Sequence, residues 1–290
     1  MAFSIPTLSI SRARGYIFRL PLFTRCILVI CFVVWLLSFQ SKWDIVQWGA
    51  LIPNEVGLGS MYRINTYPFI HLNFLHGLLN LVVLTPLLER FEAEHGTLST
   101  LAMFTGREST SPTRLASFAG RANAETVWCS LAFSTFPAGM YILLEYGILR
   151  SNSPAMGVST WIFILIASEA IRTYRVNPHF NLGPYKIPTW TTPFIFILLI
   201  SFLVPSTSFV DHLCALAVGY VFGLGYLKFI APPEKVLRWV EGKLNLLGRL
   251  PHYVSVDQMT YGRYGILPQT AAAEAGHSMN YTGSTQRLGA

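Results

Sequence analysis

The chain has 290 residues, of which 52% are hydrophobic and 12% are charged. Its mean hydropathy of +0.45 exceeds what the core of a soluble protein of this length requires, which excludes an ordinary soluble protein and predicts a polytopic membrane protein. The formal net charge is +7, but the basic residues are scattered at the ends of apolar segments. They form no stripe, so they predict membrane topology and no nucleic-acid partner.

Six apolar segments are candidate transmembrane helices, because about 20 apolar residues are needed to cross the hydrocarbon core. The predicted fold class is therefore all-α, a six-transmembrane-helix bundle in a lipid bilayer. The first segment follows several arginines, as in a signal peptide, but it lacks a small-residue cleavage pattern and is predicted to be a retained helix. The six spans lie near residues 21–39, 68–88, 127–148, 155–171, 190–205 and 209–230.

The distribution of lysine and arginine predicts that both termini are cytosolic, because most basic residues then fall on the cytosolic side of six alternating spans. The second, fourth and sixth spans would enter the membrane from the lumenal side. Residues 1–20 would form a cytosolic N-terminal tail, residues 21–231 the transmembrane domain, and residues 232–290 a largely disordered cytosolic C-terminal tail. The last of these regions has too little apolar content to pack beyond residue 268.

A polar stretch, residues 106–126, interrupts the approach to the third span and is predicted to be a cytosolic loop. Without it, Met103-Phe104-Thr105 would continue into Phe133-Ser134-Thr135-Phe136 as one span. An inserted loop and an error in the gene model both fit this pattern.

Two polar side chains stand near the start of long apolar segments, where a helix in lipid rarely carries them. They are Ser159, in Gly157-Val158-Ser159-Thr160, and His212, in Asp211-His212-Leu213-Cys214. Polar groups at membrane depth usually face the protein interior or a water-filled cavity. A serine and a histidine at matched depth predict a nucleophile and its general base, the chemistry of an intramembrane serine protease.

Small residues recur along the sixth span and predict its packing. Ala215, Gly219 and Gly223 share a helix face with His212, and such a face allows two helix backbones to approach closely. We therefore expect His212 to point toward the fourth span, which carries Ser159.

The second span carries His76 and Asn80 four residues apart, on one helix face. As neutral donors they are predicted to stabilise the oxyanion of a tetrahedral intermediate, or alternatively to bond to each other and fix helix contacts. Gly157 permits a non-helical entry to the fourth span, which leaves backbone N–H groups at its start available to the same oxyanion.

Other protease chemistries fit the sequence poorly. The HExxH pattern of zinc proteases is absent, so a metal site formed by His71, His76 and His212 is disfavoured and no cofactor is expected. An aspartyl mechanism needs paired aspartates within the spans, but Asp211 stands alone at a membrane edge. Asp211 is also a poor triad member, because adjacent helical residues point roughly 100 degrees apart. A transporter is disfavoured because Glu145 and Glu169 form no evident charge pathway.

These residues together resemble the rhomboid family of intramembrane serine proteases, most closely its fungal Golgi-type members. The family's His-x-x-x-Asn matches His76 and Asn80, its Gly-x-Ser matches Gly157 and Ser159, and its His-x-x-small-x-x-x-Gly matches His212, Ala215 and Gly219. The resemblance implies that Ser159 is the nucleophile, His212 the base, and His76 and Asn80 the oxyanion donors. The chain departs from many rhomboids at Thr160, where they have glycine, and in lacking a Trp-Arg pair in residues 40–66.

The resemblance also implies a location and partners. It implies a Golgi membrane, membrane-anchored protein substrates that include a sterol-regulating transcription factor precursor, and recruitment of a cytosolic AAA-family unfoldase. The tail sequence Tyr261-Gly262-Arg263-Tyr264-Gly265-Ile266-Leu267 has the pattern of a short docking motif. A catalytically inactive rhomboid-like adaptor that delivers clients to such an unfoldase is the alternative.

Overall fold

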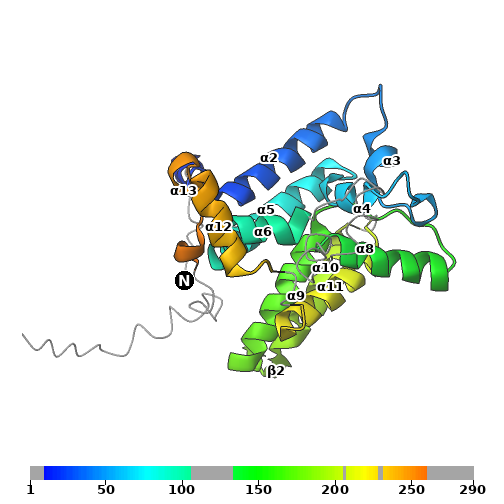
Figure 1. Ribbon diagram of the computed structural model, residues 1–290. Coiled ribbons are helices and arrows are strands. Elements are labelled where there is room, and N and C mark those ends of the chain that lie inside the picture. The colour runs from blue at the N-terminus through cyan, green and yellow to red at the C-terminus, as the bar shows by residue number, and fades with distance from the viewer. Residues whose placement is uncertain (1–9, 106–132, 205–206, 228–230, 260–290) are drawn as a thin grey trace, which may run out of the picture.

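The computed structural model describes residues 10–105, 133–204, 207–227 and 231–259 of the chain. These residues are mainly helical, as predicted, and their longer helices pack together in one bundle (Figure 1). In chain order the α-helices are α1 (Ile10–Ile17), α2 (Leu22–Leu37), α3 (Ile45–Gly49), α4 (Arg63–Thr66), α5 (Phe74–His95), α6 (Thr97–Thr105), α8 (Thr135–Ile142), α9 (Ser159–Val176), α10 (Thr192–Leu203), α11 (Phe209–Leu224), α12 (Glu234–Leu244) and α13 (Leu246–Arg249).

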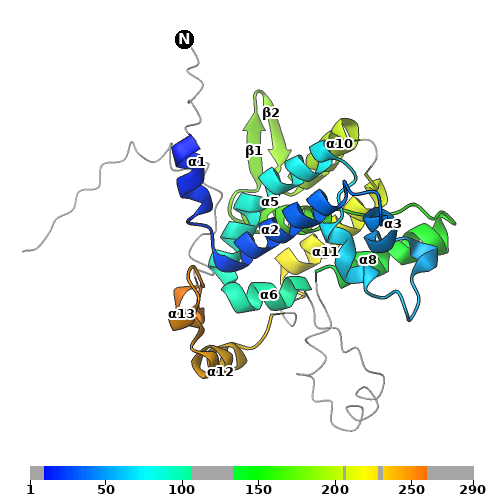
Figure 2. The same ribbon diagram turned by 90° about the horizontal axis from the view of Figure 1, so that it is seen from above.

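Shorter elements connect these helices. A two-stranded antiparallel hairpin, β1 (His179–Leu182) and β2 (Tyr185–Pro188), joins α9 to α10 and extends beyond the helices in Figure 2. Its register pairs His179 with Pro188 and Leu182 with Tyr185. The remaining elements are the 3-10 turns η1 (Pro53–Glu55), η2 (Tyr67–Phe69), η5 (Thr189–Thr191) and η7 (Val256–Gln258), and the π-helical turn η4 (Leu143–Ile148).

Length and apolar composition separate α5 from the other described helices. By these two criteria, α5 is the one helix in the described ranges that could cross a membrane alone, and the apolar segments Leu22–Leu37, Thr189–Leu203 and Phe209–Leu224 are shorter. The predicted second span, 68–88, was placed too early, because α5 begins at Phe74 and runs to His95. The Asn73 side chain accepts a hydrogen bond from the His76 backbone N–H and starts the helix there.

The two ends of the interrupted third span meet in the structure. The Phe133 N–H donates to the Met103 carbonyl at 2.6 Å, and the Ser134 hydroxyl donates to the Phe104 carbonyl at 3.3 Å. Helices α6 and α8 therefore continue one another in the way that deleting residues 106–126 would predict. Residues 106–132 lie outside the described residues.

Helix α9 is the centre of the bundle, and α11 runs alongside it (Figure 1). An ideal Cβ on Gly219 would lie 2.5 Å from the Ile164 carbonyl oxygen, and one on Gly223 would lie 2.8 Å from the Ser168 carbonyl oxygen. The small-residue face of α11 thus lets the two backbones touch, and the partner predicted for it is confirmed.

A buried carboxylate ties the start of α2 to the end of α5. Glu92 accepts hydrogen bonds from the backbone N–H groups of Phe23 and Thr24, at 2.9 and 2.8 Å, and from the Thr24 hydroxyl. It also accepts from the Thr97 hydroxyl at 2.7 Å. A negative charge at a helix N-terminus satisfies free N–H groups and interacts favourably with the helix dipole, so Glu92 holds three helix ends together.

The C-terminal segment docks on this junction. The Leu22 N–H donates to the His252 carbonyl at 2.9 Å, the Thr97 N–H donates to the Val254 carbonyl at 2.9 Å, and the Val254 N–H donates to the Thr97 hydroxyl. Both views place α12 and α13 beside the start of α2 (Figures 1 and 2). Residues 252–259 of the predicted tail, 232–290, are therefore packed on the bundle, whereas the stretch expected to be disordered, 268–290, lies outside the described residues.

Candidate active site

The serine and histidine predicted from the sequence are in contact. Ser159 is the first residue of α9 and His212 lies in the first turn of α11, and both side chains are buried. The Ser159 Oγ and the His212 Nε2 are 3.0 Å apart, which is hydrogen-bond distance. The imidazole also packs against the Phe163 ring, with ring centroids 4.6 Å apart. Packing of α11 on α9 thus brings together two residues that are 53 positions apart in the chain.

His76 and Asn80 point toward the residues that precede Ser159. An ideal Cβ on Gly157 would lie 3.0 Å from His76 Nε2 and 3.2 Å from Asn80 Nδ2. Both side chains are buried, and neither these two nitrogens nor His76 Nδ1 has a hydrogen-bond partner among the described residues. They do not bond to each other, so two buried donor groups remain available beside the serine.

Gly157 is required at its position for two reasons. Its φ of +110° lies in a region that side-chain-bearing residues rarely adopt. A Cβ would also meet His76 Cε1 at 2.9 Å, closer than real Cβ atoms approach other heavy atoms. The glycine therefore lets the backbone pass directly under the two donors.

The segment before Ser159 is held in an extended conformation by the loops between α2 and α5. Leu51 and Ala155 form a two-way backbone pair, with both N–H to carbonyl distances at 2.9 Å. The Gly157 N–H donates to the Tyr67 carbonyl at 2.9 Å. Arg63 fixes these loops in turn, because its guanidinium donates to the Ala50 carbonyl at 2.7 Å. These bonds determine where α9 starts and therefore where the serine hydroxyl lies.

Asp211 contacts Thr160, the residue after the serine, and forms no hydrogen bond with His212. Its Oδ2 accepts a hydrogen bond from the Thr160 hydroxyl at 2.7 Å, and the His212 Nδ1 has no hydrogen-bond partner among the described residues. The residue after the serine and the residue before the histidine are thus bonded to each other. The sequence identified Thr160 only as a departure from glycine, since nothing in its local pattern shows a contact 51 positions away.

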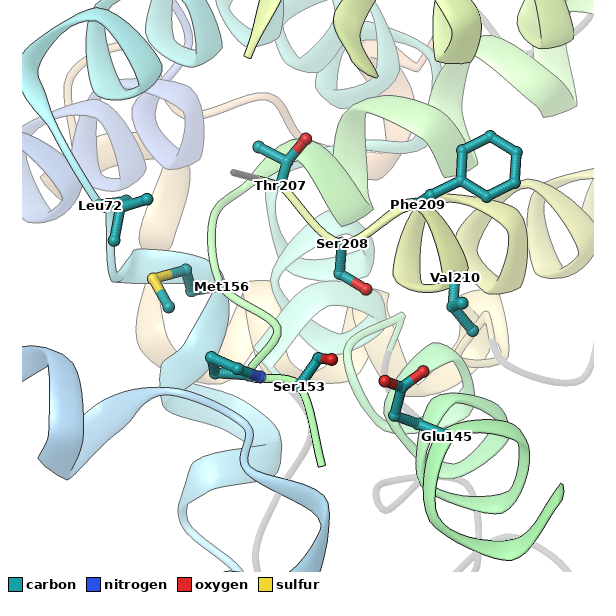
Figure 3. A pocket seen from close by; sticks show the side chains of 9 residues that line it. Leu72, Glu145, Ser153, Met156, Thr207, Ser208, Phe209 and Val210 are labelled. Atoms are coloured by element: carbon teal, nitrogen blue, oxygen red, sulfur yellow. The ribbon is translucent and has the colours of Figure 1, made fainter. Parts of the chain in front are cut away.

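A cavity of about 370 Å³ is lined in part by residues that lie just before Ser159 and His212 in the chain, and its polar wall has no role predicted from the sequence. Glu145, from η4, contributes a buried carboxylate to this wall. Figure 3 shows the carboxylate oxygens directed into the space that Ser208 and Val210 border. The cavity is lined by Leu72, Glu145, Ser153, Pro154, Met156, Thr207, Ser208, Phe209 and Val210.

The fold and the site define a class of protein. It is a helical membrane protein in which a serine hydroxyl and an imidazole meet inside the bundle, beside two unpartnered donors. A sequence model of the rhomboid domain matches residues 58–229, and the chain therefore belongs to the rhomboid family.

Relatives from three fungi agree with this assignment. The chain is 56% identical to rhomboid-type serine protease B of Aspergillus fumigatus, over 96% of this chain and 94% of the relative. It is 50% identical to rhomboid-type serine protease 2 of Neurospora crassa, over 98% and 95%, and 48% identical to the protein of that name in Podospora anserina, over 99% of each. The predictions of an integral membrane protein and of a rhomboid-type serine endopeptidase, a hydrolase, are confirmed.

Proposed function

We propose that the chain cleaves transmembrane segments of membrane-anchored proteins with a Ser159–His212 dyad. The observation that carries this proposal is the 3.0 Å contact between Ser159 Oγ and His212 Nε2. The serine oxygen forms a bond to the scissile carbonyl carbon while its proton passes to Nε2. The imidazolium then gives that proton to the leaving amine, and a water molecule, deprotonated by the same imidazole, hydrolyses the acyl-enzyme.

A dyad without a third member is supported by the surroundings of the histidine. The Nδ1 of His212 has no partner in the described part of the chain, and Asp211 is bonded to Thr160. The imidazole is therefore oriented by packing against Phe163 and by the serine itself.

We further propose that His76 and Asn80 stabilise the negative oxygen of the tetrahedral intermediate, together with the free N–H groups at the start of α9. Their unpartnered donor atoms beside Gly157 support this role. Removing one donor from a known oxyanion hole costs about 3 kcal/mol of transition-state stabilisation, so each side chain would contribute on the order of a hundredfold in rate.

The finer predictions on topology, location and partners extend this proposal. Six spans with cytosolic termini would open the site toward the lumen. A Golgi location and a sterol-regulating transcription factor precursor as substrate draw on the family resemblance. So does the AAA-family unfoldase, whose proposed docking motif at residues 261–267 lies outside the described residues. The inactive-adaptor alternative is not favoured, because the serine and histidine are in contact and the relatives are named as proteases.

Labelling with a serine-directed fluorophosphonate tests the dyad. We expect labelling of the purified protein in detergent to be lost in Ser159→Ala and to fall at least a hundredfold in rate in His212→Ala. Ser168→Ala is the matched control, because this buried serine lies on the same helix and its hydroxyl donates to the Leu165 carbonyl. Labelling that persists in both site variants would exclude the proposed chemistry.

A further inference from the structure

The cavity that Glu145 borders is lined by residues that immediately precede the proposed catalytic pair in the sequence. Two of its lining residues, Met156 and Val210, stand three positions before Ser159 and two before His212. A peptide whose carbonyl carbon reaches the serine oxygen would therefore have neighbouring side chains within reach of this space. The inference below rests on the proposed function and concerns which side chain the space accepts.

Glu145 is an unusual residue in the wall of this cavity, because its carboxylate lacks a partner from the described residues. The residue is 4% exposed, its carboxylate oxygens border the cavity, and no described residue forms a hydrogen bond or ion pair with them. Burying a carboxylate without a partner is costly, and protein interiors normally supply a cation or several donors. A largely buried carboxylate that faces an open cavity is explained most simply if its partner arrives from outside.

The other walls fit a long cationic side chain. Ser153, Thr207 and Ser208 bring hydroxyl groups to the same space, and these oxygen atoms can accept hydrogen bonds from an ammonium or guanidinium group. Leu72, Met156, Phe209 and Val210 give apolar surface for the methylene groups of such a side chain. The volume of about 370 Å³ is large enough to hold one lysine or arginine side chain.

We propose that this cavity is a substrate subsite for a basic side chain close to the scissile bond, and that Glu145 determines its specificity. Placing the cation beside the carboxylate replaces water on both groups with a charge-assisted hydrogen bond, so a basic substrate gains binding energy that a neutral one does not. The carboxylate is not part of the proton transfer, and a neutral substrate is still cleaved.

A series of substrates tests the proposal. One transmembrane substrate is made with Lys, Gln or Glu at each position from four residues before the scissile bond to two residues after it. For the unaltered enzyme we expect kcat/KM to be at least tenfold higher with Lys than with Gln at one of these positions. Glu145→Gln should reduce that ratio to about one and leave cleavage of the Gln substrate within threefold. Glu145→Lys should favour the Glu substrate at the same position.

Controls separate this inference from the proposed chemistry. Asp44→Asn removes an exposed carboxylate that does not line the cavity and retains an acceptor for the Gln47 N–H, so it should keep the preference for Lys. Fluorophosphonate labelling reports an intact site in each variant. If the unaltered enzyme neither labels nor cleaves any substrate of the series, the proposed function itself is contradicted. Full labelling with no preference for Lys at any position, or an unchanged preference in Glu145→Gln, would overturn the subsite alone. If Glu145→Gln fails to label, Glu145→Asp is compared with the unaltered enzyme. Glu145→Asp keeps the negative charge and should keep a preference for Lys over Gln, and a complete absence of this preference in both proteins would overturn the subsite.

Discussion

At the scale of single residues, the site depends on a glycine that no other residue can replace. Gly157 combines a φ of +110° with an ideal Cβ position 2.9 Å from the His76 ring. Gly157→Ala should therefore strain the backbone by about 1–3 kcal/mol and displace His76 or Asn80. We expect kcat to fall at least a hundredfold, measured by cleavage of a transmembrane substrate.

Gly139→Ala is the control for this prediction, because the Cβ added there meets no atom within 4 Å. Within a helix, alanine is also the better residue, so this variant should fold at least as stably and keep its activity. Equal activity of the two alanine variants would contradict the role given to Gly157.

The hydrogen bond between Thr160 and Asp211 is a second prediction at this scale. Thr160→Val removes the donor and leaves a buried carboxylate with no partner in the described residues, so we expect a loss of stability of about 1–3 kcal/mol. Asp211→Asn keeps an acceptor oxygen for the threonine and should be milder. A double-mutant cycle by thermal denaturation should give a coupling of about 1 kcal/mol, and additive effects would show that the bond does not link the two helices.

These residues also show what the sequence could reveal of the site. Ser159, His212, His76 and Asn80 were recognisable because polar side chains are costly at membrane depth and stand out among apolar neighbours. Glu145 stood out in the same way, but its role depends on which side of η4 faces a cavity, and that follows only from the packing of α8 and α11. Short-range patterns identify the residues, whereas long-range packing gives them their surroundings.

At the scale of secondary structure elements, the α9–α11 interface sets the distance between Ser159 and His212, the proposed nucleophile and base. Gly219→Val would place a branched side chain where even a Cβ lies 2.5 Å from the Ile164 carbonyl oxygen. The helices must separate or the variant must misfold, so we expect fluorophosphonate labelling to fall at least tenfold and the melting temperature to drop. Val221→Ile adds one methylene group to a side chain of α11 that is 38% exposed and should leave both unchanged. Normal labelling of Gly219→Val would contradict the role of this contact.

The packing partner of α11 was predictable because a four-residue repeat of small residues has one physical meaning in a helix, close approach of another backbone. The start of α5 was not predictable from hydropathy, because the apolar segment extends back to residue 68 whereas the hydrogen bond to the Asn73 side chain starts the helix at Phe74. Hydropathy locates an apolar segment, but side-chain capping sets its end.

At the scale of the whole molecule, the C-terminal segment is part of the folded bundle. No periodicity in residues 231–259 could indicate this docking, since it depends on hydrogen bonds between residues that are more than 150 positions apart, as in Thr97 and Val254. The packed segment ends close to Gly96, where an ideal Cβ would lie 3.1 Å from the Met259 sulfur. The described bundle therefore includes residues 252–259, which are part of the region 232–290 predicted to be a tail.

Two truncations separate docking from the remainder of the tail. Ending the chain after residue 251 removes the carbonyl groups of His252 and Val254 that accept from Leu22 and Thr97, and it exposes the junction around Glu92. Three hydrogen bonds at about 1 kcal/mol each predict a loss of about 3 kcal/mol in detergent, seen as a lower melting temperature and faster inactivation on heating. Ending the chain after residue 259 retains every one of these contacts and should leave the melting temperature and labelling of the purified enzyme unchanged. Both shortened chains lack the proposed unfoldase motif, so any difference in melting temperature between them in detergent reports the docking of residues 252–259 on the bundle. Equal melting temperatures would show that this contact contributes nothing to stability.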